Sequence, residues 1–579
     1  MRMRYLCVLG VLGGLFQSSL ALDREAFTST KYDLTIRIEP EQQRLAAEGK
    51  ITLRNDSSEP QKHLSLQISS TLGWRSIRFE GKPVDFLPQA YTSDIDHTGS
   101  LSEAIVTLPH EIPPKSIIEL DVRYEGTIPL DATRLTRIGV PENLAKHSDW
   151  DQISPAFTAL RGAGHVVWYP VAMESANLSE GNSTFETLGR WSARTARASM
   201  RISLCEVADA GKGQSWLMNN PPPQGASGGG LAAAGHENTA TCGEHLFPEV
   251  GEIVPVILGG AYADLQQGAI DVHYALDHRT AAQTYATLAA KTLPFVTEWF
   301  GRPRVKVEVA ELPDPQAAPF ESGPMLLTPL GNIDPGLAEI AIVHQLTHAS
   351  FSSPRLWIYE GLAHFAQALY LERQRGRDAA LDFMGLHRSA VTGAEKAIAQ
   401  KRDPRNAADQ SLINTFTEEF YRSKAAYVWW MLRDMVGETA LKKALASYHP
   451  DQDNEPSYMQ RLIEAQAHRD LEWFFDDWVY RDRGLPDFRV DSVYPRPIVS
   501  GGYMLTVTLE NLGTAGAEVP VILKMEEGDL RKRLEVGAKS KNSIRFEVPT
   551  LPSEVVVNDG SVPESDATNN TFKIEGAAK

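Results

Sequence analysis

The hydrophobic pattern of this chain changes its period twice, and that restricts the folds open to it. Up to about Asp271, apolar and polar residues alternate, as in segments 32–39 and 49–54, and this alternation is typical of half-buried strands. From about Tyr274 the period becomes helical, and from about Phe488 short strand-like segments return. The 579 residues also suggest roughly three to four domains, at about 150 residues each. The sequence therefore predicts a multidomain α+β protein.

The domain boundaries follow from the same pattern. We expect a signal peptide over 1–21, an N-terminal antiparallel β domain with two sheets or a saddle over 22–273, and a mainly helical domain over 274–487. Residues 488–579 contain short strands separated by turns, which fits an immunoglobulin-like β-sandwich.

Several helices of the central region have readable ends. Segment 279–300 is amphipathic and stops at Gly301 and Pro303, both of which break helices. The other predicted helices of this region cover 336–350, 359–375, 377–401, 415–436 and 468–481.

The N-terminus has the pattern of a secretory leader. Arg2 and Arg4 precede an apolar run over 5–16, and Ser19-Leu20-Ala21 supplies small residues for cleavage. An N-terminal membrane anchor is the alternative, but twelve residues are too few to span a bilayer. We therefore expect a secreted or periplasmic protein with no stable membrane span after removal of the signal.

Cysteine content and charge limit the remaining possibilities. Cys205 and Cys242 are the two cysteines outside the leader, and an oxidising compartment favours a disulfide between them over two free thiols. This disulfide would close the Gly/Pro/Ala-rich stretch 211–235, which we interpret as a flexible surface insertion. The net charge of −17 argues against a nucleic-acid partner, because such proteins need a basic surface.

One histidine pair carries the chemistry that the sequence suggests. His344 and His348 are four residues apart in a helical apolar pattern, so both imidazoles lie on one helix face. A catalytic zinc ion needs three protein ligands and an open fourth position, and Glu360 in the next predicted helix is the candidate third ligand. His364 lies on the same face as Glu360 and is better placed to orient a ligand than to close the site.

These residues resemble a known family. The two-histidine helix followed by Trp357-Ile358-Tyr359-Glu360-Gly361-Leu362-Ala363 looks like a gluzincin metallopeptidase, and more narrowly like the membrane alanyl aminopeptidase family. The resemblance implies a thermolysin-like central domain, one zinc ion and a peptide substrate that loses its N-terminal residue. It also implies that Glu321 binds the peptide α-amino group and that Tyr421 stabilises the oxyanion, with Tyr427 as the rival tyrosine.

The sequence departs from the family pattern in several places. Gln345 stands where the family has the glutamate that accepts a proton from the attacking water, and a carboxamide cannot accept that proton. Tyr421 is one residue further from Lys424 than the family tyrosine, Ser322 replaces an asparagine, and the interval from His348 to Glu360 is short.

Three interpretations of Gln345 stay open. The chain is a slow zinc aminopeptidase, a catalytically inactive homologue that binds peptides or proteins, or a sequence in which Gln345 was introduced to trap substrate. Rescue by Glu339 is not expected, because a residue five positions before His344 faces away from it on a helix.

Overall fold

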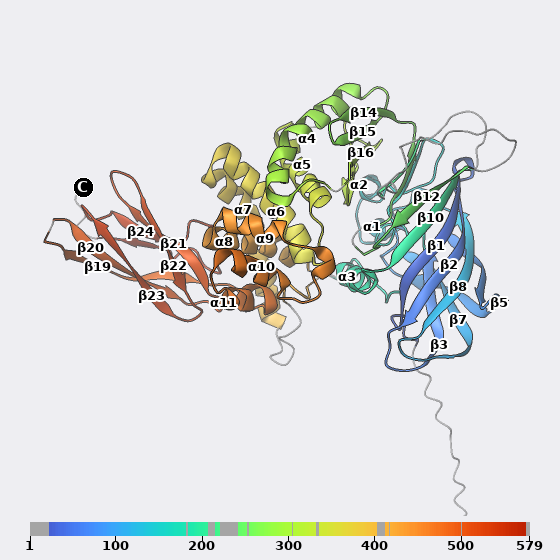
Figure 1. Cartoon of the computed structure of the whole chain (residues 1–579), viewed down its shortest axis with the longest axis horizontal. Coiled ribbons are helices and arrows are strands. Elements are labelled where there is room, and N and C mark those ends of the chain that lie inside the picture. Colours follow the sequence, from blue (N-terminus) through green and yellow to red (C-terminus); the bar gives the residue numbers. More distant parts are fainter. Residues whose placement is uncertain are drawn as a thin grey trace, which may run out of the picture.

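The computed structural model describes residues 22–180, 183–206, 215–219, 241–251, 254–303, 305–331, 335–401, 411–415, 417–499 and 501–574. Within them the chain is a multidomain protein with six β-sheets and eleven α-helices. Figure 1 shows an elongated arrangement in which the N-terminal strands, with α1 to α3 beside them, lie at one end, α4 to α11 in the middle and the C-terminal strands at the other end. The predicted signal peptide lies outside the described residues.

A seven-stranded sheet in the order β12-β10-β1-β2-β8-β4-β5 dominates the N-terminal end. Its strands are β1 (Phe27–Glu39), β2 (Arg44–Asn55), β4 (Leu72–Phe79), β5 (Lys82–Pro83), β8 (Ile117–Thr127), β10 (Ser199–Glu206) and β12 (Thr241–Phe247). A second sheet, β3-β7-β6, contains β3 (Gln61–Ser69), β6 (Asp85–Thr92) and β7 (Ser100–Ile112). Apolar residues of both sheets, such as Ile36 and Val106, belong to one buried core.

The expectation of an antiparallel sheet is wrong at one strand pair. β10 runs parallel to β1, whereas β1 and β2 are antiparallel. A parallel pair requires a long connection, and here the chain passes through several elements before it returns. After strands β2 to β8, these elements are α1 (Thr133–Arg137), α2 (Glu142–Ser148), β9 (Phe157–Leu160) and α3 (Ser183–Thr195).

The cysteines lie opposite each other in this sheet. Cys205 of β10 pairs in register with Cys242 of β12, and a disulfide joins them. The stretch 211–235 is not wholly irregular, because Ser215–Met218 forms β11 and pairs with β13 (Ile257–Gly260). The rest of that stretch, apart from Asn219, lies outside the described residues.

A five-stranded mixed sheet in the order β14-β15-β16-β18-β17 leads into the helices. Its strands are β14 (Ala263–Gln267), β15 (Ile270–Tyr274), β16 (Val307–Glu311), β17 (Phe320–Ser322) and β18 (Met325–Thr328). β14 and most of β15 precede the boundary predicted after residue 273, so this sheet crosses it. Alternation identifies strands, but it does not say which sheet a strand joins.

Helices form the middle of the molecule. They are α4 (Arg279–Phe300), α5 (Pro335–Ser350), α6 (Leu356–Arg375), α7 (Arg377–Lys401), the π-helix η2 (Glu419–Lys424), α8 (Ala425–Val436), α9 (Glu438–Ala446), α10 (Tyr458–Ala467), α11 (Glu472–Phe475) and the π-helix η4 (Asp476–Tyr480). Short 3-10 turns cover Pro40–Gln42 (η1) and Pro450–Gln452 (η3). α4 ends where predicted, at Gly301 with φ +88°, a conformation that glycine adopts without strain.

Two antiparallel sheets form the C-terminal end. One has the order β19-β20-β23 and the other β22-β21-β24-β25. Their bounds are β19 (Phe488–Pro497), β20 (Tyr503–Asn511), β21 (Ala517–Lys524), β22 (Leu530–Val536), β23 (Lys541–Val548), β24 (Glu554–Val557) and β25 (Thr571–Lys573). Val507 and Val521, one from each sheet, are fully buried in a core that continues into the helices.

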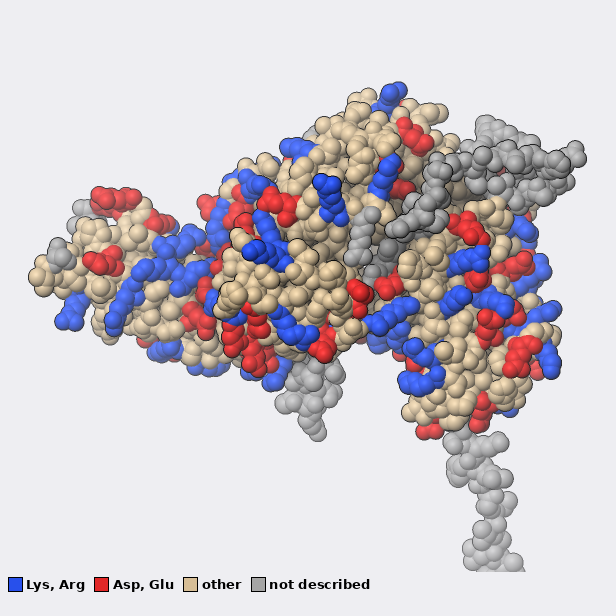
Figure 2. All heavy atoms as spheres, viewed as in Figure 1, with Lys and Arg blue, Asp and Glu red and all other residues tan. Residues whose placement is uncertain are grey.

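None of the helices in the described ranges has the length and apolar character needed to cross a bilayer. On the face shown in Figure 2, acidic and basic side chains are interspersed.

Candidate metal centre

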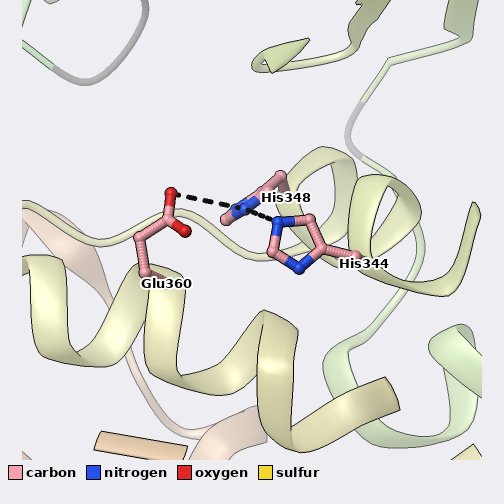
Figure 3. Close-up of side chains that lie close together, drawn as sticks. All are labelled: His344, His348 and Glu360. Atoms are coloured by element: carbon pink, nitrogen blue, oxygen red, sulfur yellow. Dashed lines mark hydrogen bonds and ion pairs between the residues drawn. The ribbon is translucent and has the colours of Figure 1, made fainter. Parts of the chain in front are cut away.

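Two neighbouring helices bring three side chains together. His344 and His348 project from α5, Glu360 projects from the first turns of α6, and the three point toward one another (Figure 3). The two histidine Nε2 atoms are 3.1 Å apart, and His348 Nε2 lies 3.7 Å from Glu360 Oε1. All three donor atoms lie within 4.8 Å of one another.

This spacing fits one zinc ion. Tetrahedral zinc with Zn–N distances near 2.0–2.1 Å separates two ligand atoms by about 3.3 Å. This value lies between the His344–His348 and the His348–Glu360 separations. Burial is the main cause that lowers the pKa of both histidines, to about 3, so both imidazoles are neutral and have a lone pair to offer. The donor set of two imidazoles and a carboxylate is also one that zinc prefers.

Arg422 holds the second oxygen of the candidate ligand Glu360. Its Nε donates to Glu360 Oε2 over 3.1 Å, and its Nη1 contacts Glu418. Since Oε2 is taken by the guanidinium, Oε1 stays directed at the histidines. Outer contacts of this kind orient metal ligands.

Gln345 is buried beside His344 and bonded at both ends of its amide. Tyr285 on α4 donates its hydroxyl to Gln345 Oε1 over 2.8 Å, and Gln345 Nε2 donates to Glu321 Oε1 over 3.0 Å. Burial and the charge of Glu321 raise the pKa of Tyr285 above its usual range, so this hydroxyl stays a donor. These two hydrogen bonds therefore fix the orientation of the Gln345 amide, with its oxygen toward Tyr285 and its nitrogen toward Glu321.

Glu321 is half-buried on β17, an edge strand of the five-stranded sheet. Burial is the largest cause that raises the pKa of this carboxyl, the charge of Glu360 adds to it, and Gln345 and Arg422 act in the opposite direction. Ser322 receives a hydrogen bond from Asn219 Nδ2 over 2.7 Å and donates one to the Val254 carbonyl. Residues from the N-terminal part of the chain thus hold the strand that carries Glu321.

Tyr421 is buried on the π-helix η2, and burial raises the pKa of its hydroxyl above the usual range. Its ring centre lies 5.8 Å from the Arg422 guanidinium carbon. The rival Tyr427 donates its hydroxyl to the Met384 carbonyl over 2.8 Å, so that hydroxyl is already committed to the backbone.

His364 lies beside the histidine pair, with its ring centre 4.7 Å from that of His344. Its Nδ1 is 3.0 Å from Gln367 Oε1, so its hydrogen bond goes to Gln367 and not to a candidate ligand. Glu339 accepts hydrogen bonds from Lys291 and Tyr370, which agrees with its predicted direction away from His344.

A cavity of about 380 Å³ opens next to His348. Apolar side chains form much of its wall, among them Pro324, Phe351 and Tyr359, and the ring of Tyr359 lies 4.0 Å from that of His348. The cavity is large enough to receive an apolar side chain beside His344, His348 and Glu360, the candidate metal triad.

Sequence reasoning missed two residues of this site. Tyr285 lies sixty positions before Gln345 on another helix, and no local pattern marks it. Arg422 stands in the segment that resembles the family's tyrosine motif, two positions before Lys424. That is the place where the family pattern has its tyrosine, so the substitution itself was a signal.

Comparison with known proteins supports the fold. No family model and no curated protein sequence matches the chain. The solved structure of Legionella pneumophila aminopeptidase A in complex with aspartic acid is similar to 94% of this chain, with a TM-score of 0.57 and 11% identity. A second one, a point mutant of the M1 zinc metallopeptidase from Deinococcus radiodurans, aligns over 81% of this chain and 97% of its own length, with a TM-score of 0.45 and 17% identity.

The chain therefore shares the fold of an aminopeptidase structure over most of its length. It spans only 59% of the Legionella protein. At this identity the likeness concerns the fold alone, and the chemistry has to be argued from the residues of the site.

Proposed function

We propose that this chain is a secreted zinc metallopeptidase of the aminopeptidase type, whose turnover is slowed by Gln345. His344, His348 and Glu360 would hold the ion, which when bound activates water and polarises the peptide carbonyl. The observation that carries the proposal is that the three donor atoms lie as close together as the ligands of one zinc ion. Glu321, which accepts a hydrogen bond from Gln345, lies beside them.

The position of Glu321 favours cleavage at a peptide N-terminus. A half-buried carboxylate beside the metal triad can form a charge-assisted hydrogen bond with a free α-amino group. β17 lies at a sheet edge, and edge strands can pair with an extended peptide. These features support binding of one N-terminal residue with its carbonyl directed at the metal triad.

Proton transfer from the attacking water is the step that this site supports least. Gln345 can orient water through hydrogen bonds, but it cannot take a proton. Loss of a general base lowers rates by roughly 10² to 10⁴, so we expect slow hydrolysis by the wild-type chain.

The test compares aminoacyl chromogenic substrates on the zinc-loaded wild type and the Gln345→Glu variant. We expect the variant to be faster by ~10² or more. Gln367→Glu is the matched control, because that amide bonds to His364 and the Ile340 carbonyl and should not raise turnover. Equal rates for wild type and Gln345→Glu would show that Gln345 does not limit the reaction.

A second candidate function is peptide binding without hydrolysis. Its specific support is that Gln345 accepts one hydrogen bond and donates another, so the amide is well accommodated as it stands. If neither the wild type nor Gln345→Glu hydrolyses a substrate in the same assay with zinc bound, this candidate is favoured.

A further inference from the structure

We propose that Arg422 makes this site a receptor for a free α-amino acid, with the α-amino group on Glu321 and the α-carboxylate on the Arg422 guanidinium. The inference rests on the proposed function for the amine contact and the metal. It adds a ligand class and a role for a residue that the sequence resemblance leaves without one.

The geometry puts a cation at the metal triad. Arg422 touches the candidate ligand Glu360 directly, through Nε. Its contacts with Glu360 and Glu418 use Nε and Nη1, and its side chain is still 39% exposed. A guanidinium has five N–H donors in a planar fork that matches a carboxylate, so donors are left for the two oxygens of a ligand.

Glu321 and Arg422 act on the same small space. Glu321 Oε1 accepts a hydrogen bond over 3.0 Å from Gln345, the residue after His344, whereas Arg422 Nε donates to Glu360, whose other oxygen lies 3.7 Å from His348 Nε2. An anion and a cation therefore flank the histidine pair. An α-amino acid carries the complementary charges, an ammonium and a carboxylate, on either side of one carbon atom.

The charge balance favours a ligand that keeps its carboxylate. A glutamate at position 345 would place a third carboxylate near Glu321 and Glu360, and it would repel a bound carboxylate. Gln345 is neutral, and Arg422 adds a positive charge where the family pattern has a neutral tyrosine. Both departures make the site more favourable for an anion than a site of the family pattern.

The cavity beside His348 indicates the side chain. Its wall contains Phe351, Tyr359 and Pro324, which suits an apolar group, since burial of apolar surface favours binding. L-Leucine is therefore the first probe.

The experiment is isothermal titration of the zinc-loaded full chain with L-leucine, L-leucinamide and N-acetyl-L-leucine. Leucinamide lacks the carboxylate and N-acetyl-leucine lacks the ammonium. A lost charge-assisted hydrogen bond corresponds to about tenfold or more in affinity. We expect L-leucine to bind at least about tenfold more tightly than either analogue.

Variants separate the two contacts. Arg422→Gln should bind L-leucine no more tightly than leucinamide, and Arg422→Lys should keep part of the preference for L-leucine. Arg388→Gln on α7 is the control, because Arg388 is exposed and should change neither. Zinc content, measured in parallel, shows whether each variant keeps its metal site.

The outcomes distinguish this inference from the proposed function. Equal affinities for L-leucine and leucinamide in the wild type, or an unchanged preference in Arg422→Gln, would overturn the role of Arg422 and leave the proposed function standing. Equal affinities for L-leucine and N-acetyl-leucine would instead overturn the amine contact at Glu321, on which both depend.

Discussion

At the scale of single residues, the site depends on how buried charges are compensated. Gln345 lies between a tyrosine hydroxyl and the carboxylate of Glu321. A glutamate there would stand about as close to Glu321 as the amide does now, and like charges at such a distance keep one carboxyl protonated. A neutral amide at position 345 therefore fits its neighbours without a second charge beside Glu321.

Glu564, in the loop between β24 and β25, provides a test of buried charge by pH. Burial is the largest cause that raises the pKa of this carboxyl, from 4.5 to about 7, although Asn558, Asn570 and the Phe488 amide donate to it. The folded state thus holds the proton more tightly than the unfolded state. Its contribution to stability is complete below about pH 4.5 and is lost as the pH rises through 7.

Glu564→Gln should remove that loss. A rise of this size corresponds to about 3 kcal/mol, so the variant should gain up to about 3 kcal/mol over the wild type between pH 4 and pH 8. Urea unfolding at several pH values measures this difference. Glu547→Gln, at an exposed position of β23, is the control, and a parallel pH profile for Glu564→Gln and wild type would contradict the account.

Local spacing is enough to predict some of the side chains that lie together in the candidate site. The i, i+4 spacing of His344 and His348 and the position of Glu360 are sufficient to predict the cluster that the structure brings together. The link from Tyr285 to Gln345 is different, because it depends on how α4 packs against α5. The local hydrophobic period of a helix does not predict which other helix it packs against.

At the scale of elements, α6 must approach α8 closely. Gly361, next to Glu360, has no side chain, and an added Cβ would lie 2.7 Å from Ala425 Cβ and 3.1 Å from Trp429 Cδ1. Trp429 in turn stacks on Trp357 at 5.1 Å. The glycine therefore allows the helix that carries Glu360 to reach its place.

Gly361→Ala should push these helices apart. Overpacking of this kind costs about 1–3 kcal/mol, and the displacement of Glu360 should weaken zinc binding by about tenfold, as loss of an orienting contact does. Chelator competition and urea unfolding measure the two effects. Gly385→Ala is the matched control on α7, where an added Cβ meets nothing within 4 Å. If Gly361→Ala binds zinc as the wild type does, the close approach does not position Glu360.

Helix ends were predictable, but the irregular helix was not. The helix predicted over 279–300 is α4, which ends at Gly301, and α7 begins at Arg377, directly after Gly376. The helix predicted over 415–436 divides into the π-helix η2 and α8. Arg422 and Lys424 lie on that π-helix, and Lys424 is buried between Glu395 and Asp482. These long-range ion pairs leave no signal in the local sequence pattern.

At the scale of the whole molecule, the candidate site receives contacts from a distant part of the chain. The N-terminal part contacts it through Asn219, which bonds to Ser322 beside Glu321. The disulfide Cys205–Cys242 lies in the same part of the chain, between β10 and β12. Sequence periodicity predicted the strands, but not that β10 runs parallel to β1, because the chain order of a sheet depends on long connections.

The disulfide should stabilise the N-terminal sheet and leave metal binding unchanged. The cysteines are 37 residues apart, and closure of such a loop is worth about 4 kcal/mol. Replacement of both by serine should lower the free energy of unfolding of this part by about that amount, while zinc content stays at the wild-type level. Reductant should destabilise the wild type and have no effect on the double variant. A wild type that unfolds identically with and without reductant would show that this bond does not contribute.

The central claim is that His344, His348 and Glu360 hold one zinc ion, and metal analysis tests it most directly. The full chain, dialysed against a weak chelator, should retain one zinc per molecule by mass spectrometry of the metal. His348→Ala and Glu360→Ala should each lose it, and His364→Ala should keep it, because His364 bonds to Gln367 and to none of the three. Absence of zinc from the wild type, or its retention in both ligand variants, would contradict the account.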